Sequence, residues 1–156
     1  MVKPQLFFRE AEIEDLPRLI ALLADDELGQ KREKLGDVID HRYIAAFQNM
    51  AQDPNNHLIV VWLEEEIVGM LQLTFIEGLS RLGSTRGQIE AVRVANKHRG
   101  KGIGSLCFQW AIEKCRQRGC DLVQLTSDKS RTDAQRFYKN LGFKGSHIGY
   151  KLLLEA

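Results

Sequence analysis

A glycine-rich turn with two basic residues lies in the second half of the chain, as Arg99-Gly100-Lys101-Gly102-Ile103-Gly104. Glycine has no Cβ, so its backbone N–H groups can approach a ligand without steric hindrance. An apolar helical pattern begins near Ile103, and the unpaired N–H groups and the dipole of a helix N-terminus attract phosphate. Arg99 and Lys101 add positive charge. The turn therefore predicts a phosphate or pyrophosphate site, and a connector that binds no ligand is the alternative.

The glycine spacing separates this turn from two common phosphate-binding motifs. The Walker pattern Gly-x-x-x-x-Gly-Lys-Ser/Thr is absent from the sequence. The third glycine comes one residue too early for the dinucleotide fingerprint Gly-x-Gly-x-x-Gly. That fingerprint also follows the first strand of its unit, whereas several predicted strands precede this turn. A nucleotide-binding enzyme of the Rossmann type is therefore disfavoured.

The strand predicted just before the turn, at residues 88–94, carries a candidate general base. Strict alternation along this strand puts Glu90 on the same face as Val92 and Val94. A carboxyl group on an apolar face is expected to have a raised pKa, which suits a base that works near neutral pH. A structural ion pair, perhaps with an arginine, is the other role that the sequence leaves open.

The elements that position these residues alternate between strands and helices. Apolar periodicity predicts strands at residues 6–9, 58–63, 67–76, 88–94, 122–126 and 151–154, and helices at 13–23, 39–50, 103–118 and 134–141. Residues 25–37 predict a loop, or a helix whose limits the pattern does not define. This order predicts one α/β domain over residues 1–156, with a mixed sheet and helices on both faces.

The composition fits a compact domain and argues against several classes of partner. The 156 residues are 44% hydrophobic, with 22 basic and 21 acidic residues and a net charge of +1. This balance indicates neither a nucleic-acid partner nor a membrane partner. No apolar run is long enough to cross a bilayer, and no targeting segment is found at the N-terminus. We therefore expect a cytoplasmic protein.

The cysteines and histidines show no spacing typical of a metal or redox site. The cysteines Cys107, Cys115 and Cys120 are odd in number and contain no CxxC pair. Two of them fall in one helical pattern, where free cysteine usually packs as a small buried side chain. The histidines are scattered, at His41, His57, His98 and His147. We therefore expect no metal ion and no cysteine acyl-enzyme.

Three motifs, in this order and spacing, resemble those of the GNAT superfamily of acyl-CoA N-acyltransferases. A hairpin turn is matched at Ile67-Val68-Gly69, and the signature Arg/Gln-x-x-Gly-x-Gly/Ala is matched at 99–104. A helix and turn that ends in Phe-Tyr-x-x-Leu-Gly-Phe is matched at 134–143. The resemblance extends over nearly the whole chain. It implies the fold of this family, with a central, mostly antiparallel sheet and helices on both faces.

The resemblance also implies that acetyl-CoA is the co-substrate and that the acetyl group passes directly to a primary amine. The glycine turn would hold the pyrophosphate, and the pantetheine arm would lie like an added strand against the preceding strand. The cofactor-binding residues implied by position are Val92, Arg93, Val94, Arg99, Gly100, Lys101, Gly102, Ile103, Gly104, Ser105, Arg131 and Phe137. Many members carry asparagine where this chain has Arg131, which would contact the cofactor phosphates or face solvent.

Glu90 and Tyr138 are the residues that the sequence assigns to catalysis. The matched motif implies that Tyr138 lies near the thioester sulfur, where it can donate a proton or a hydrogen bond to the departing thiolate. A packing role for Tyr138, with its hydroxyl group bonded elsewhere, is the alternative. An acyl-CoA-binding sensor without turnover is the competing function, and it would need neither residue.

The acceptor stays open between a small-molecule amine and a protein amine. Arg81 and Arg86, in the predicted loop 77–86, would bind an anionic substrate or remain solvated. Gln72 and Thr74 share a strand face and are candidates to line the acceptor slot. The segment 146–151 locally resembles bacterial aminoalkylphosphonate acetyltransferases, a likeness too short to indicate the substrate. The oligomeric state is open as well, although members of the superfamily often form homodimers.

Overall fold

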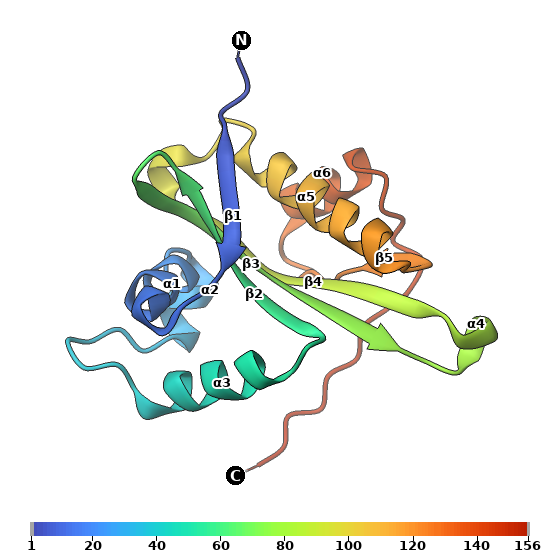
Figure 1. The fold of residues 1–156 in the computed structure, drawn as a ribbon, viewed down its shortest axis with the longest axis horizontal. Coiled ribbons are helices and arrows are strands. Elements are labelled where there is room, and N and C mark those ends of the chain that lie inside the picture. The colour runs from blue at the N-terminus through green and yellow to red at the C-terminus, as the bar shows by residue number, and fades with distance from the viewer. Residues whose placement is uncertain (1, 156) are drawn as a thin grey trace.

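A five-stranded sheet forms the centre of the computed structural model, which describes residues 2–155 (Figure 1). Its strands follow the sequence order and are β1 (Leu6–Glu10), β2 (Asn56–Leu63), β3 (Glu66–Glu77), β4 (Thr85–Val94) and β5 (Leu122–Gln124). The first four strands pair antiparallel, and β5 runs parallel to β4. The predicted mixed, mostly antiparallel sheet is therefore confirmed.

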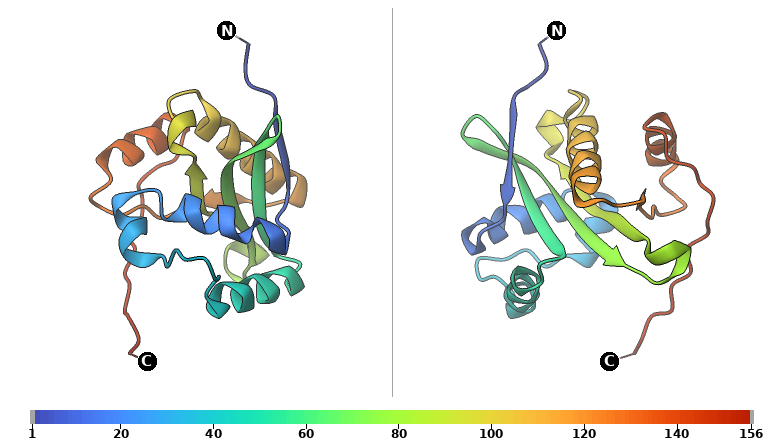
Figure 2. Two further views of the ribbon diagram at one scale, coloured as in Figure 1. Left: turned by 90° about the vertical axis from the view of Figure 1, so that its left-hand side faces the viewer. Right: turned by 45° about the vertical axis from the view of Figure 1, so that its right-hand side comes forward.

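Helices cover both faces of this sheet, as predicted (Figures 1 and 2). Six α-helices lie within residues 2–155, namely α1 (Leu16–Leu23), α2 (Glu27–Arg32), α3 (His41–Gln52), α4 (Ser80–Gly83), α5 (Ile103–Arg118) and α6 (Thr132–Asn140). Helix α5 packs against β3, β4 and β5 from one side, while α1 and α3 contact the sheet from the other. None of these helices is both long enough and apolar enough to span a bilayer.

The face of the sheet beneath α5, called the core face below, is apolar and closed. Leu71, Leu73 and Ile89 are at most 2% exposed and pack against Cys107 and Cys115 of α5. This contact is close, because a Cβ added to Gly87 would lie 2.2 Å from Sγ of Cys115. A glycine in β4 therefore lets the helix approach the strand. The opposite face, called the cleft face below, carries Met70 beneath α1.

A β-bulge at Ala91 changes which side chains of β4 face the core. Ala91 has a φ of 51°, and the pairing of β3 with β4 shifts register between Met70 and Gln72. Glu90 pairs with Gln72 and Arg93 with Met70, so both lie on the cleft face. Val92 and Val94 pack into the core below α5.

The predicted side-chain alternation in β4 is thus wrong at Glu90. One extra residue in a strand reverses the face of all that follow it. Glu90 therefore does not share a face with Val92 and Val94, and its side chain is exposed rather than set in an apolar environment. The sequence shows no glycine at the bulge that would have revealed it.

Three further parts of the chain differ from the predicted elements. The undefined segment 25–37 contains α2, which Asp26 caps by accepting a hydrogen bond from the Gly29 amide at 2.5 Å. Strand β5 is shorter than predicted and ends at Gln124. The predicted strand 151–154 is not formed: the segment is extended but unpaired, and Leu152, Leu153 and Leu154 are 87–89% exposed.

Candidate active site

Strands β4 and β5 separate after a short parallel contact, and this opening leaves part of β4 without a partner on one side. The paired residues of β4 are Arg86, Gly87 and Gln88. From Ile89 to Val94 the edge of β4 that would continue toward β5 is free. Free backbone N–H and C=O groups on a strand edge can bind an extended, amide-containing ligand as an added strand.

A cavity of about 380 Å³ lies at the far end of this free edge. Its walls come from the end of β4, the glycine turn, the start of α5 and α6, through Val94, His98, Arg99, Gly100, Gly102, Ile103, Gly104, Ser105 and Phe137. Eight of these nine residues belong to the predicted cofactor-binding set, and His98 is the addition. The structure thus brings together residues from two motifs that lie more than thirty positions apart.

The glycine turn presents the start of α5 to this cavity. Gly102 has a φ of 81° and precedes Ile103, the first residue of α5, without a side-chain cap. The first intrahelical bond that follows joins the Leu106 amide to the Gly102 carbonyl at 3.2 Å. The N–H groups of Ile103, Gly104 and Ser105 therefore have no partner within the helix, which makes this end of α5 suited to bind an anion.

The two basic residues of the turn differ in position. Arg99 is bound to the protein: its Nε donates to the Val94 carbonyl at 3.1 Å and its Nη2 to the Asp25 carbonyl at 3.2 Å. An ion pair to the Asp25 carboxylate, at 3.6 Å, adds to these contacts. Lys101 is exposed and does not line the cavity. Arg99 therefore fixes the turn against the segment after α1, while Lys101 contributes charge from outside.

A row of amide and carboxylate side chains crosses the cleft face below the free edge of β4. It consists of Asn56, Gln72, Gln88, Glu90 and Gln124, and is called the polar row below. Glu90 Oε1 accepts from Gln88 Nε2 at 2.8 Å, and Gln88 Oε1 accepts from Gln124 Nε2 at 2.7 Å. The candidate base thus has a hydrogen-bonded neighbour that orients it.

Tyr138 of α6 packs among aromatic rings at the base of the opening. Its ring contacts those of Phe108, Phe137 and Phe143 edge to face, with centroid separations of 5.5–6.4 Å. Burial raises the pKa of Tyr138 above its ordinary value, and the charges of Arg131 and Arg93 oppose that rise. The hydroxyl group therefore stays protonated near neutral pH, as a proton donor must.

Arg93 and Arg131 lie close to Tyr138 and not at the glycine turn. Arg131 forms an ion pair with Asp26, which stands 105 positions away at the start of α2. Arg93 Nε lies 4.0 Å from the same Asp26 oxygen, and Arg93 Nη1 donates to the Val92 carbonyl at 3.0 Å. Neither residue lines the cavity at the turn. No sequence pattern indicates the contact of Arg131 with Asp26, because the two residues are far apart along the chain.

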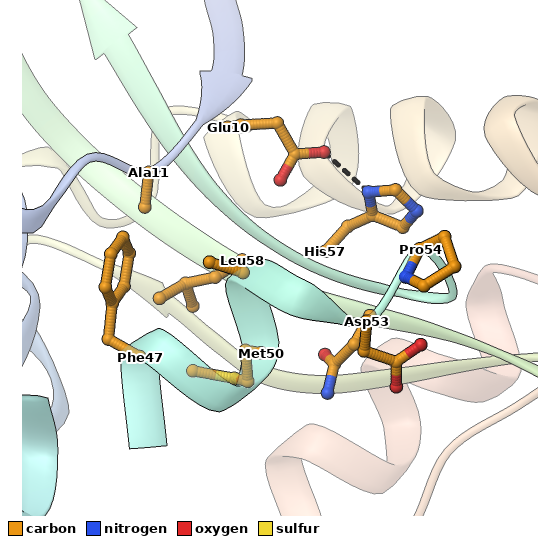
Figure 3. Close-up of a pocket in the computed structure, with 10 residues that line it drawn as sticks. Glu10, Ala11, Phe47, Met50, Asp53, Pro54, His57 and Leu58 are labelled. Carbon is orange, nitrogen blue, oxygen red and sulfur yellow. Dashed lines mark hydrogen bonds and ion pairs between the residues drawn. The ribbon is translucent and has the colours of Figure 1, made fainter. Parts of the chain in front are cut away.

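A second cavity, of about 270 Å³, lies between α3 and the beginning of β2 (Figure 3). Its walls are Glu10, Ala11, Phe47, Met50, Ala51, Asp53, Pro54, Asn56, His57 and Leu58. The His57 ring and the Glu10 carboxylate meet at 2.5 Å on its rim. Asn56 accepts from Gln72 at 3.0 Å, so this cavity adjoins the polar row. Sequence reasoning missed it because three separate elements build it.

The remaining sequence candidates are distributed between the hairpin tip, the cleft face and the core. Arg81 is exposed at the tip of the β3–β4 hairpin, and the structure does not bring it to the cleft. Gln72 and Thr74 lie on the cleft face, as the alternation predicted. Cys107 and Cys115 are buried in α5, and burial raises the pKa of each thiol to about 12. The prediction that they pack as small buried side chains is confirmed.

Comparison with known proteins establishes the class of this chain. Residues 16–143 match the acetyltransferase (GNAT) family. The chain therefore belongs to this family, and it is an N-acetyltransferase, as the glycine turn, the parting of β4 and β5 and the Phe-Tyr helix indicate.

Two relatives and one solved structure show how far the similarity extends. The chain is 32% identical to the aminoalkylphosphonate N-acetyltransferase of Salmonella typhimurium, over 96% of this chain and 92% of the relative. It is 26% identical to the glucosamine 6-phosphate N-acetyltransferase of Arabidopsis thaliana, over 72% and 76% of the two chains. A crystal structure from Bacillus halodurans C-125, described as a transcriptional regulator, superposes with a TM-score of 0.92 at 49% identity, over 96% and 100%.

Proposed function

We propose that this enzyme transfers the acetyl group of acetyl-CoA directly to the primary amine of a small molecule, in the opening between β4 and β5. The observation that carries the proposal is the cavity of about 380 Å³ at the uncapped start of α5. It stands at one end of the free edge of β4, with Glu90 near the other end. Donor and acceptor would thus meet along a single strand.

The donor side uses backbone groups more than side chains. The N–H groups of Ile103, Gly104 and Ser105 would bind the pyrophosphate, because they have no partner within α5. The free edge of β4 at Val92 and Val94 would hold the amide-containing arm as an added strand. When bound, acetyl-CoA supplies an activated acyl thioester.

Two side chains would handle the protons of the reaction. Formation of the amide makes one C–N bond and breaks one C–S bond, while the amine loses a proton and the thiolate gains one. Glu90, which accepts a hydrogen bond from Gln88, would take the proton from the amine directly or through water. Tyr138, whose raised pKa keeps it protonated, would give a proton to the thiolate.

The names of the two relatives support a small acceptor over a protein acceptor. Aminoalkylphosphonates and glucosamine 6-phosphate are both small amines. The polar row and the second cavity offer such a molecule hydrogen-bonding groups near Glu90. We propose further that the protein acts in the cytoplasm as one domain without a metal ion, and that it forms a homodimer.

The test is release of free CoA with a panel of amines, measured for the parent and for Glu90→Gln and Tyr138→Phe. Each variant is expected to lower kcat by about 10²- to 10⁴-fold, the usual contribution of a general base or acid. The acetyl-CoA concentration that half-saturates a thermal shift should not change. Glu113→Gln, an exposed glutamate of α5, is the matched control. Undiminished turnover in either variant would remove that residue from the mechanism.

One observation favours a second function, a sensor that binds acyl-CoA without turnover. The neighbour from Bacillus halodurans C-125 is described as a transcriptional regulator and is 49% identical. A sensor would show the thermal shift with acetyl-CoA and release no CoA with any amine. It would also tolerate both substitutions without loss of that shift.

A further inference from the structure

Two arginines from distant parts of the chain, Arg93 and Arg131, lie near Tyr138, and Arg32 lies near Arg93. Arg32 comes from the end of α2, Arg93 from β4 and Arg131 from the residue before α6. Burial lowers the pKa of Arg93 below its ordinary value; the charge of Asp26 opposes this, and those of Arg131 and Arg32 add to it. Three like charges at close range are costly unless something negative lies among them.

The protein sets two carboxylates, Asp26 and Asp128, against these three arginines, and Asp128 interacts with Arg32 and Arg131 and not with Arg93. Asp26 is shared between Arg93 and Arg131, and its other oxygen accepts from the Gly29 amide. Burial alone would raise the pKa of Asp26, but the Gly29 amide and the two arginines hold it below its ordinary value. The 4.0 Å between Asp26 and Arg93 Nε is too long for a hydrogen bond.

Arg93 consequently carries a buried donor with no acceptor. Its side chain is 17% exposed, and Nε has no hydrogen-bond partner among the described residues. An unpaired charged donor in such a position is destabilising unless a bound group satisfies it. Because Asp26 lies too far away to satisfy this Nε, an oxyanion bound beside Arg93 would supply the missing acceptor.

The arginines lie at a fixed distance from the candidate base. Glu90 pairs with Gln72 and Arg93 with Met70, so the two side chains leave the cleft face two positions of β3 apart. That is about 7 Å along a strand. A small molecule with an amine near Glu90 and an anionic group a few bonds away would reach Arg93.

We propose that Arg93 and Arg131 form a subsite for an oxyanion on the acceptor. The preferred substrates are then small primary amines that carry a phosphonate, phosphate or carboxylate group. This inference rests on the proposed function, because it assigns the amine to Glu90. A guanidinium donates two parallel hydrogen bonds to such groups. The same positive charge disfavours amines that carry no anionic group. The subsite would therefore attract one class of amine and exclude the other.

The first experiment compares amines that carry an anionic group, called anionic amines here, with counterparts that lack one. The probes are 2-aminoethylphosphonate, phosphoethanolamine and β-alanine, with propylamine and ethanolamine as counterparts, and kcat/KM is measured by CoA release. The anionic amines are expected to be better by roughly 10- to 100-fold, as a charge-assisted hydrogen bond provides. Preference among the three identifies phosphonate, phosphate or carboxylate as the group recognised.

The second experiment removes the arginines singly. Arg131→Gln and Arg93→Gln should raise KM for the best anionic amine by about tenfold or more and leave KM for acetyl-CoA unchanged. Arg136→Gln, an exposed arginine on α6 paired with Asp133, is the matched control and should change neither. Arg131 is 32% exposed, so its variant keeps the test decisive if Arg93→Gln unfolds.

The third experiment removes the competing carboxylate. Asp26→Asn keeps an acceptor for the Gly29 amide, since asparagine also caps helices well. It should lower KM for the anionic amines, because both arginines lose their shared partner.

Three results would overturn the subsite: equal kcat/KM for amines with and without an anionic group, a rise in KM for acetyl-CoA alone in Arg131→Gln, or a loss of stability without any change in preference. In each case turnover itself persists. Absence of CoA release with every amine would instead refute the proposed function.

Discussion

The two faces of the central sheet have opposite properties although the same strands make them. On the core face, Leu71 and Ile89 are 0% and 2% exposed and lie beneath α5. On the cleft face, their chain neighbours Gln72 and Glu90 belong to the polar row and reach solvent. The difference shows that alternate residues of these strands form a closed apolar core on one face and a polar, solvent-accessible surface on the other. The bulge at Ala91 preserves that division, because it returns Val92 to the core and sends Arg93 to the cleft.

The largest contrast is expected between Leu71→Ala and Gln72→Ala, adjacent residues on opposite faces. Leu71→Ala should lower the free energy of unfolding by about 2–5 kcal/mol, because it leaves a cavity in a closed core. Gln72→Ala should change it by no more than about 0.5 kcal/mol. Urea unfolding measures both. Comparable losses would show that the cleft face is packed as tightly as the core.

A smaller effect is expected where the bulge exchanges the two faces. Ala91→Val places a β-branched side chain at a φ of 51°, a region that such residues avoid. It should cost about 1–3 kcal/mol of unfolding free energy. Turnover should fall as well, because Glu90 and Arg93 would lose their common orientation. Ala91→Gly, which relieves the conformation, is the control and should retain activity.

Gln88→Ala tests the cleft face with little cost to the fold. The substitution removes the hydrogen bond to Glu90 and the one from Gln124. We expect a stability change of about 0.5–1 kcal/mol and a fall in kcat larger than any rise in KM, because Glu90 loses the group that orients it. Steady-state kinetics with detection of released CoA measures kcat and KM separately. An effect on KM alone would make Gln88 a binding residue.

No effect at all is expected at pH 8 on the thiols of the core face. Cys107 and Cys115, each with a pKa of about 12, should remain unmodified by a thiol reagent at pH 8 in folded Cys120→Ser protein. The unfolded chain releases these protons from about pH 8.5 upward. Stability should therefore fall between that pH and about 12, and not below it. Rapid labelling of the folded variant would show that the core face opens.

Much of the donor side could be predicted from the sequence, because local patterns define it. Gly102 and the apolar run after Ile103 place a helix N-terminus, and the structure sets Phe137 against it. Residue type and spacing are enough to predict this part of the structure, because each contact lies within or next to a motif. The helix limit at Gly119, with a φ of 82°, followed from the same reasoning.

The acceptor side could not be predicted, because contacts between distant residues determine it. One bulge reversed the face of Glu90, and no glycine marks its position. The ion pair between Asp26 and Arg131 joins residues 105 positions apart. The segment 151–154 is an apolar run of strand length, but a strand also needs a pairing partner, which the fold does not give it.

The extra residue at Ala91 has a consequence for how this enzyme could change. Because Glu90 and Arg93 share one face and Val92 and Val94 the other, a mutation can reach one set without disturbing the other. Under the proposed function, selection for a new amine would then act on Arg93, with Glu90 retained as the base and the valines that face the core left unchanged. A library restricted to position 93 is accordingly a short route to a new acceptor preference.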